Sequence, residues 1–261
     1  MSADAIFDPG WRKTASPAIA LWARAALPLA IQALQGQPRR HGGTWAVGLD
    51  LLPNDETGAI GAPLPWEDLG LAPQPLHRAQ LSAVYPGYPG RDPDETDAAH
   101  RFRLTRDAAH LDGLLPLGPD KRRFMKEPHA WVLGLALTEV TAAPLVVWEG
   151  SHLILARALH QALEPHPPET WGDIDLTEAY AAARRACFDQ CRRVEIAQSP
   201  GEAVILHRMI LHGVAPWAQS ASAPWTQSGN TAWATQAPAH GRINAYFRPL
   251  LPSVRDWLTL A

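Results

Sequence analysis

The sequence has few cysteines, no dominant charge and no long hydrophobic run. Its two cysteines, Cys187 and Cys191, lie four residues apart in a stretch expected to be helical. This favours reduced thiols, with a metal-binding or redox pair as the alternative. The formal net charge of -3 gives no electrostatic basis for binding nucleic acid or an anionic membrane. Arg24 and Pro28 interrupt the Ala- and Leu-rich residues 18–34, which therefore predict a packed helix and no membrane span.

Two kinds of short motif are also missing. The sequence contains no Gly-x-Gly-x-x-Gly and no Gly-Lys pair, so no glycine-rich nucleotide site is indicated. The start at Met1 lacks a positive segment followed by an apolar core, so we expect no secretory signal and a cytoplasmic protein. At 261 residues, with 46% hydrophobic and 19% charged residues, the chain is typical of one globular domain, 1–261. A small-molecule partner is expected, and the oligomeric state stays open.

The N-terminal residues 1–40 predict a helical layer. Ser16 and Pro17 resemble an N-cap followed by a proline in the first turn, and Gly36 fits a helix end. Pro28 should kink or split the helix between them.

The residues from 44 to 254 predict a β-rich core. Short apolar runs separated by Pro, Gly and Asn are typical of a sandwich or barrel. A helix, opened by a capping box at Asp175, is expected to interrupt the strands at about 175–193. The predicted strands are Thr44–Leu51, Ala79–Tyr85, Arg101–Arg106, Ala130–Leu137, Pro144–Trp148, Ala203–Leu206 and Arg242–Phe247.

Three residues form a candidate metal site. In an extended chain, His110 and Asp112 point the same way and can reach one ion, although Asp112-Gly113 is also a common turn dipeptide. His212 and His207 are the candidates for the third ligand, and the family resemblance given below favours His212. Two imidazoles and one carboxylate can cover one face of a non-haem Fe(II) ion and leave positions open for a co-substrate and O₂.

A strand further on carries the candidate anion clamp. Arg242, Asn244, Tyr246 and Arg248 alternate with apolar residues, which predicts one polar and one apolar face. If the polar face points inward, the planar guanidinium of Arg242 can bind a carboxylate through two hydrogen bonds. Arg248 is the alternative clamp.

Three segments resemble the phytanoyl-CoA dioxygenase family of 2-oxoglutarate-dependent oxygenases. They are Gly134-Leu-Ala-Leu-Thr-Glu139, Pro144 to Gly150-Ser-His152, and Gly201 to His207 leading into His212. The resemblance covers roughly Leu76 to Pro249. It implies a mainly β fold with flanking helices, a double-stranded β-helix of the jelly-roll or cupin-like kind.

The resemblance also implies the activity. Fe(II), held by His110, Asp112 and His212, would bind 2-oxoglutarate and use O₂ to hydroxylate a small molecule, with succinate and CO₂ as co-products. Arg242 or Arg248 would bind the distal carboxylate of the co-substrate. Gln80 and Leu135 are expected to line the co-substrate pocket. Two alternatives remain open: a cupin-like metalloenzyme that does not use 2-oxoglutarate, and a non-catalytic binding protein on the same fold.

A long uncharged stretch separates the third ligand from the clamp. Residues 214–239 carry Trp217, Trp225 and Trp233, and a segment of this length in a compact domain is often functional. We expect a lid over the metal, with fixed packing on the barrel or a dimer contact as the alternative.

Overall fold

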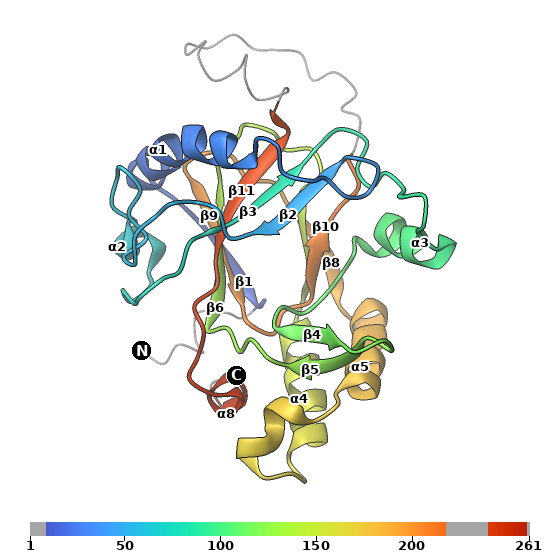
Figure 1. The fold of residues 1–261 in the computed structure, drawn as a ribbon. Coiled ribbons are helices and arrows are strands. Elements are labelled where there is room, and N and C mark those ends of the chain that lie inside the picture. The colour runs from blue at the N-terminus through green and yellow to red at the C-terminus, as the bar shows by residue number, and fades with distance from the viewer. Residues whose placement is uncertain (1–8, 218–239, 260–261) are drawn as a thin grey trace.

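Two antiparallel sheets form the centre of the computed structural model, which describes residues 9–217 and 240–259 (Figure 1). One sheet has the strand order β1-β9-β6-β11-β3-β2 and the other the order β10-β7-β8, while β4 and β5 pair as a separate ribbon. The strands are β1 (Trp11–Ala15), β2 (Trp45–Leu49), β3 (Gln80–Val84), β4 (Leu114–Leu117), β5 (Arg122–Met125), β6 (Trp131–Ala136), β7 (Leu145–Glu149), β8 (Arg192–Ile196), β9 (Glu202–His207), β10 (His212–Val214) and β11 (Arg242–Phe247).

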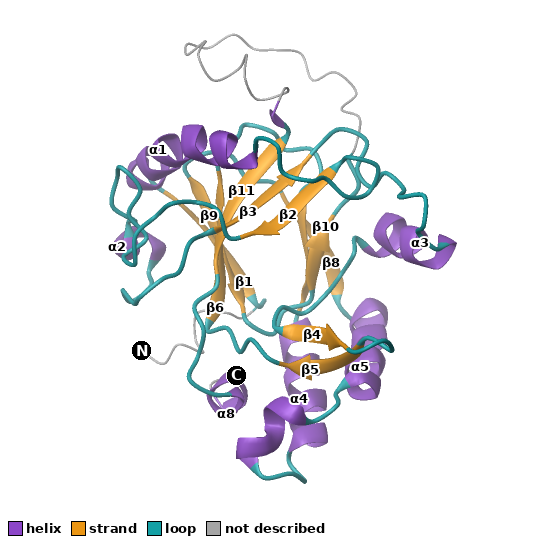
Figure 2. Ribbon diagram, viewed as in Figure 1, coloured by secondary structure: helices purple, strands orange, loops and turns teal. Residues whose placement is uncertain are grey.

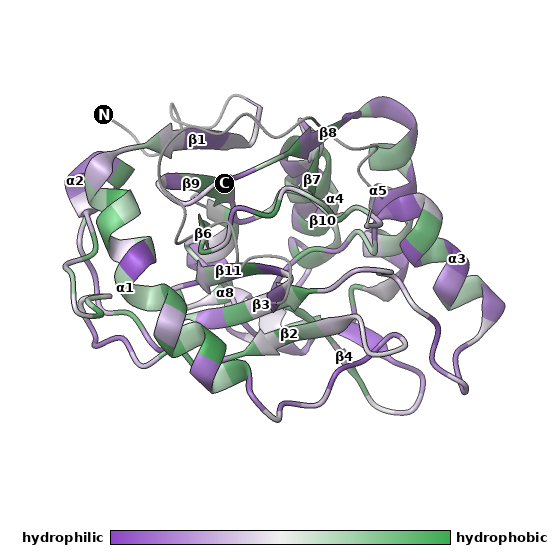
Figure 3. Ribbon diagram, turned by 90° about the horizontal axis from the view of Figure 1, so that it is seen from above, coloured by the Kyte–Doolittle hydropathy of each residue, from purple (hydrophilic) through white to green (hydrophobic). Residues whose placement is uncertain are grey.

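Helices cover the outer faces of the two sheets (Figure 2). Seen from above in Figure 3, α1 lies outside the six-stranded sheet, and α4 and α5 lie outside the three-stranded one. The chain is therefore mainly sheet with flanking helices, as the sequence predicts. The helices are α1 (Pro17–Leu34), α2 (Trp66–Leu69), α3 (Asp97–Arg106), α4 (Ser151–Leu163), the 3₁₀ helix η2 (Pro168–Asp173), α5 (Thr177–Gln190) and α8 (Val254–Thr259).

The chain crosses repeatedly between the two sheets. After β6 in the large sheet it forms β7 and β8 in the small sheet, returns for β9, crosses for β10 and returns for β11. An isolated bridge between His110 and His212 adds the segment around residue 110 to the free edge of β10. As a result, residues more than a hundred positions apart in the sequence face the same interior.

Helix α1 packs on the large sheet through a buried apolar face. The Ser16 hydroxyl accepts a hydrogen bond from the Ile19 amide at 3.1 Å, so the predicted N-cap is confirmed. Trp22 is fully buried and meets Phe247 of β11 edge to face at 5.8 Å. By length and composition alone α1 could cross a membrane, but its buried face belongs to the core cluster of this sheet.

Pro28 does not split α1, which runs unbroken from Pro17 to Leu34. A proline removes one hydrogen bond and crowds the preceding turn, and here the buried residues on either side of it, Ala26 and Ala30, keep the helix on the sheet. The predicted helical layer 1–40 is also incomplete, because β1 precedes α1 and pairs with β9 at the sheet edge.

Two further predictions need correction. The predicted strand Arg101–Arg106 is the second half of α3, which Thr96 caps through a hydrogen bond from the Ala99 amide at 3.2 Å. No residue of α3 is buried, so this segment has no apolar face to contribute to a sheet. The predicted helical insert is larger than 175–193, because α4 and η2 precede α5.

We predict that Arg193→Ala lowers the free energy of unfolding by about 1–3 kcal/mol, as measured by urea denaturation. Arg193 donates two hydrogen bonds, at 2.7 and 2.8 Å, to Asp107, whose side chain is only 3% exposed. Removing the guanidinium leaves a buried carboxylate without its partner.

Arg192→Ala is the matched control for this variant. Arg192 pairs with Glu149, but its side chain is 75% exposed, and such surface pairs contribute less than about 1 kcal/mol. Equal losses in the two variants would show that Asp107 does not depend on its partner.

Candidate metal centre

Three ligand-type side chains meet at the bridge between residue 110 and β10. The ligand atoms of His110, Asp112 and His212 all lie within 4.8 Å of one another. The Asp112 carboxylate is 3.3 Å from Nε2 of His110 and 3.8 Å from Nε2 of His212. This is the only such group of three among the residues that the structure describes. Two imidazoles and a carboxylate at this spacing fit the facial site of a non-haem Fe(II) ion.

Backbone carbonyl groups orient both imidazole rings so that Nε2 of each can bind a metal. The Nδ1 atom of His110 lies 3.0 Å from the Ala108 carbonyl oxygen, and that of His212 lies 3.1 Å from the Ile210 carbonyl oxygen. A carbonyl only accepts, so Nδ1 carries the proton when either ring is neutral. Each Nε2 of a neutral ring then has a lone pair for a metal, and both Nε2 atoms lie on the Asp112 side.

A close backbone contact brings the two histidines together. His110 and His212 exchange backbone hydrogen bonds of 2.8 and 3.1 Å, and Val214 donates a third to the Asp107 carbonyl at 2.8 Å. A Cβ atom on Gly213 would lie 2.1 Å from that same carbonyl oxygen. Glycine after His212 is therefore required by the approach of the two segments.

Burial keeps His212 neutral, and the neighbouring positive groups keep Asp112 ionised. Burial lowers the pKa of His212 to about 4, so its imidazole is neutral near pH 7. Burial alone would raise the pKa of Asp112, but His212, His110 and Arg248 outweigh it and hold that pKa well below its usual range. For His110 burial acts to lower the pKa, and the neighbouring Asp112 carboxylate reverses this and raises it. The site thus offers a permanent carboxylate for a cation.

A cavity of about 120 Å³ extends from the three ligands between the sheets. Gln80 and Ser82 of β3 line it, so the predicted pocket residue Gln80 lies at the same cavity as the three ligands. The wall is otherwise largely apolar, which restricts water near the ligands. Its remaining lining residues are Trp45, Val47, Val132, Leu145, Gly213, Val214, Tyr246 and Arg248.

The polar face of β11 points inward. Arg242 and Asn244 are 5% and 2% exposed, while Ile243 and Phe247 on the other face join the α1 core cluster. Burial lowers the pKa of Arg242, and its interacting neighbours are the phenol groups of Tyr246 and Tyr88. Its Nε and Nη2 atoms are buried without a hydrogen-bond partner, and no carboxylate pairs with it in the described part of the chain.

Arg248 occupies a different place on the same face. Its Nη1 lies 3.3 Å from Oδ2 of Asp112, and it lines the cavity beside the ligands. The two candidate clamps are thus distinct: within the described ranges, Arg248 has an acidic partner and Arg242 has none.

Two residues weighed for this site lie elsewhere. Leu135 is fully buried in the cluster beneath α1, so its assignment to the co-substrate pocket is wrong; side chains alternate along β6, and Leu135 points to the outer face. His207 lies against His152 with 4.8 Å between the centroids of the two tilted rings, and it is not part of the ligand group. Residues 218–239 of the predicted lid lie outside the described residues.

Sequence reasoning missed Trp45 and the pocket role of Tyr246. Trp45 begins β2 and stacks on Tyr88 with 4.7 Å between ring centroids, a contact that no local pattern indicates. Tyr246 could have been found, because it lies on the same strand face as Arg242.

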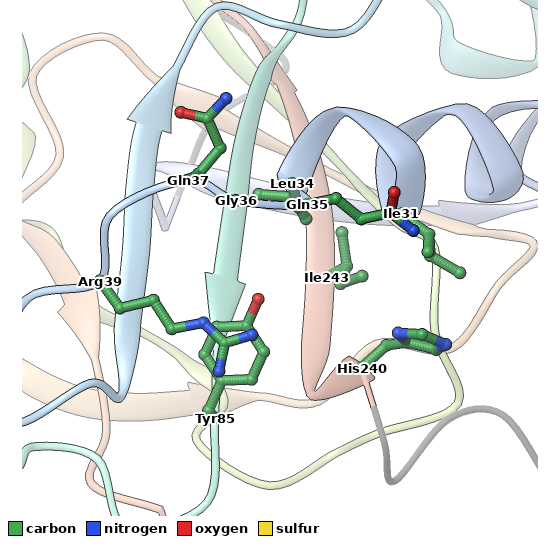
Figure 4. Close-up of a pocket in the computed structure, with 9 residues that line it drawn as sticks. All are labelled: Ile31, Leu34, Gln35, Gly36, Gln37, Arg39, Tyr85, His240 and Ile243. Atoms are coloured by element: carbon green, nitrogen blue, oxygen red, sulfur yellow. The ribbon is translucent and has the colours of Figure 1, made fainter.

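A second cavity, of about 290 Å³, lies at the C-terminal end of α1 (Figure 4). Ile243 contributes to the wall of this second cavity. The cavity therefore lies on the outer face of β11, away from the metal ligands. The Arg39 guanidinium lies 3.6 Å from the centroid of the Tyr85 ring. None of the three ligand residues lines this cavity, which is lined by Ile31, Leu34, Gln35, Gly36, Gln37, Arg39, Tyr85, His240 and Ile243.

We predict that alanine at His110, Asp112 or His212 abolishes tight binding of one divalent metal ion per chain, measured by calorimetry with Mn²⁺. Each change removes one of three ligands at an edge of the fold, so the thermal unfolding transition should remain. His207→Ala is the control and should bind the metal as the wild type does. Metal binding that survives the loss of His212 but not of His207 would contradict this ligand set.

No family model and no curated protein matches the sequence. Among solved structures, the chain is similar to SnoK, a non-heme alpha ketoglutarate dependent carbocyclase from nogalamycin biosynthesis, with 15% identity over 98% of this chain and 88% of SnoK, and a TM-score of 0.45. EctD from S. alaskensis, solved with 2-oxoglutarate and 5-hydroxyectoine, is 17% identical over 95% of this chain and 75% of its own, with a TM-score of 0.38. AviO1 from Streptomyces viridochromogenes Tue57 is 13% identical over 96% and 95%, with a TM-score of 0.40. Likeness at this level assigns neither family nor function, so the assignment rests on the geometry of the site.

Proposed function

We propose that this chain is an Fe(II)- and 2-oxoglutarate-dependent oxygenase of the phytanoyl-CoA dioxygenase type. The observation that carries the proposal is the buried Arg242 guanidinium, which has no carboxylate partner among the described residues and interacts with the phenol group of Tyr246, a residue that lines the metal cavity. A buried cation without a counter-ion is costly. An anionic ligand that reaches from the metal to Arg242 removes that cost, and a 2-oxo dicarboxylate has a chelating end and a distal carboxylate.

The strand order supports a double-stranded β-helix as the fold. The inner strands of the large sheet run β3-β11-β6-β9, and the small sheet with its added bridge runs from residue 110 through β10 and β7 to β8. Eight segments taken in chain order thus go to the two sheets as large, small, large, small, small, large, small, large. This alternation supports a jelly roll, in which two facing sheets share one continuous winding.

Each residue of the site has a defined task. His110, Asp112 and His212 hold the iron, while the carbonyl groups behind the imidazoles fix their orientation. When bound, Fe(II) supplies the O₂-dependent oxidative decarboxylation of 2-oxoglutarate to succinate and CO₂ that drives substrate oxygenation. Arg242 binds the distal carboxylate through charge-assisted hydrogen bonds.

Arg248 orients the carboxylate of Asp112 and adds positive charge where the chelating end of the co-substrate binds. The apolar wall excludes water from this end of the cavity, which strengthens both interactions. Asp112 would supply a carboxylate ligand to the ion. With this carboxylate present, hydroxylation of the substrate is the expected reaction. The substrate is a small molecule that approaches His110, whose side chain is 49% exposed. Cytoplasmic location and the absence of nucleic-acid or membrane partners stay predictions.

Succinate formation tests this function. The purified protein is incubated with Fe(II), 2-oxoglutarate and O₂, and succinate is measured with and without pools of small metabolites. Succinate that rises with a pool, and that disappears in Asp112→Ala, supports the proposal. A metal-loaded protein that binds no 2-oxoglutarate would contradict it and favour the cupin-like alternative.

We predict that Arg242→Lys weakens 2-oxoglutarate binding to the Mn²⁺-loaded protein by about 1–3 kcal/mol, as measured by calorimetry. Lysine keeps the charge and loses the planar pair of donors. Arg39→Lys is the matched control, since Arg39 lies at the second cavity and should leave the affinity unchanged. A larger loss in Arg248→Lys than in Arg242→Lys would move the clamp to Arg248.

A further inference from the structure

Tyr246 connects the metal cavity with the buried Arg242. It lines the cavity beside the ligands, and its phenol group interacts electrostatically with the Arg242 guanidinium. Arg242, Asn244 and Tyr246 lie at alternate positions of β11, so all three project from the same face. Of these three residues, Tyr246 both lines the open cavity and interacts with the buried Arg242.

Gly134 provides the space for the Tyr246 ring. The two residues are direct partners across β6 and β11, and a Cβ atom on Gly134 would lie 2.7 Å from Cε1 and 3.2 Å from Cδ1 of that ring. Gly134 has no left-handed backbone angle, so its conformation would admit any residue. Glycine is required here because the aromatic ring lies directly on the backbone.

Hydrogen bonds between buried side-chain amides hold Gly134 in place beneath the Tyr246 ring. Gln198, 6% exposed, donates from Nε2 to the Gly134 carbonyl at 3.1 Å. Its Oε1 atom accepts a hydrogen bond from Nδ2 of Asn244 at 3.2 Å. Gln198 thus ties β6 to β11 next to the ring, and satisfied buried networks of this kind restrict the geometry of their members.

We propose that Tyr246, seated on Gly134, is a positioning residue that orients Arg242 toward the distal carboxylate of the co-substrate. This inference rests on the proposed function and concerns which 2-oxo acid the site prefers. A free arginine side chain has many rotamers, and fixing it before the ligand arrives reduces the entropy lost on binding. The Tyr246 hydroxyl therefore contributes only to ligands that carry a distal carboxylate.

The test measures two ligands on the Mn²⁺-loaded protein by calorimetry. One is 2-oxoglutarate, and the other is 2-oxovalerate, which has the same carbon chain without the distal carboxylate. In Tyr246→Phe the ring and its seat remain, so the Kd for 2-oxoglutarate should rise about fivefold or more while that for 2-oxovalerate stays unchanged. In Gly134→Ala the displaced ring should produce a similar selective loss. Tyr85→Phe, on the outer face of the sheet, is the control and should alter neither Kd.

A double-variant cycle tests whether Tyr246 acts through Arg242. If it does, Tyr246→Phe should cause little further loss in the Arg242→Lys background, because coupled residues are not additive. Fully additive losses, or an equal loss for both ligands in Tyr246→Phe, would overturn the inference. A wild-type protein that binds no 2-oxoglutarate would contradict the proposed function itself, and a wild type that binds it with Tyr246→Phe unaffected would contradict only this inference.

Discussion

The backbone contact between residues 107–110 and β10 is the constraint on which the site depends. Three hydrogen bonds join these segments, and Gly213 allows an approach that no side chain would permit. Each segment carries one ligand histidine, and the same backbone supplies the carbonyl groups that set the tautomers. A shift of this contact would separate the ligands and also change the direction of their lone pairs. The geometry of the centre is thus determined by main-chain packing more than by the ligand side chains themselves.

The large sheet applies a second constraint through the alternation of β11. Its apolar residues pack beneath α1, and this fixes the register in which Arg242, Asn244 and Tyr246 face inward. A slip of one residue would place the arginine beneath the helix and the apolar residues in the cavity. The energy of the α1 core therefore also holds a buried cation in position.

Sequence patterns predicted those parts of the molecule that depend on local chemistry. The N-cap at Ser16, the strand Arg242–Phe247 and the two faces of that strand follow from neighbouring residues. The gathering of His110, Asp112 and His212 was expected from a resemblance, since spacing along the chain does not specify contacts across a hundred residues. The sequence did not show which face of β6 points into the cavity, and Leu135 was therefore assigned to the pocket in place of Gly134. Both faces of this strand are buried. Such a strand shows no alternation to read.

The same limit explains the errors in α3 and β1. Residues 101–106 alternate by chance, and only the Thr96 cap several positions earlier identifies the helix. The strand β1 is short and lies at the sheet edge, where it pairs with β9, a strand almost two hundred residues further along the chain. Edge strands gain their structure from a distant partner, and their own sequence need not be strongly apolar.

The charges of the buried side chains determine the order in which the proposed metal ion and co-substrate would bind. Asp112 carries one negative charge and contacts the Arg248 guanidinium directly, while a second guanidinium, that of Arg242 at the start of β11, is buried. A divalent ion placed on Asp112 increases this excess of positive charge and competes with Arg248 for the same carboxylate. Under the proposed function, a dicarboxylate would then bind near the ion and the two guanidinium groups, and its two negative charges would offset most of the excess. This charge balance would couple metal and co-substrate binding, so the ion should bind first and the 2-oxo acid should hold it in place.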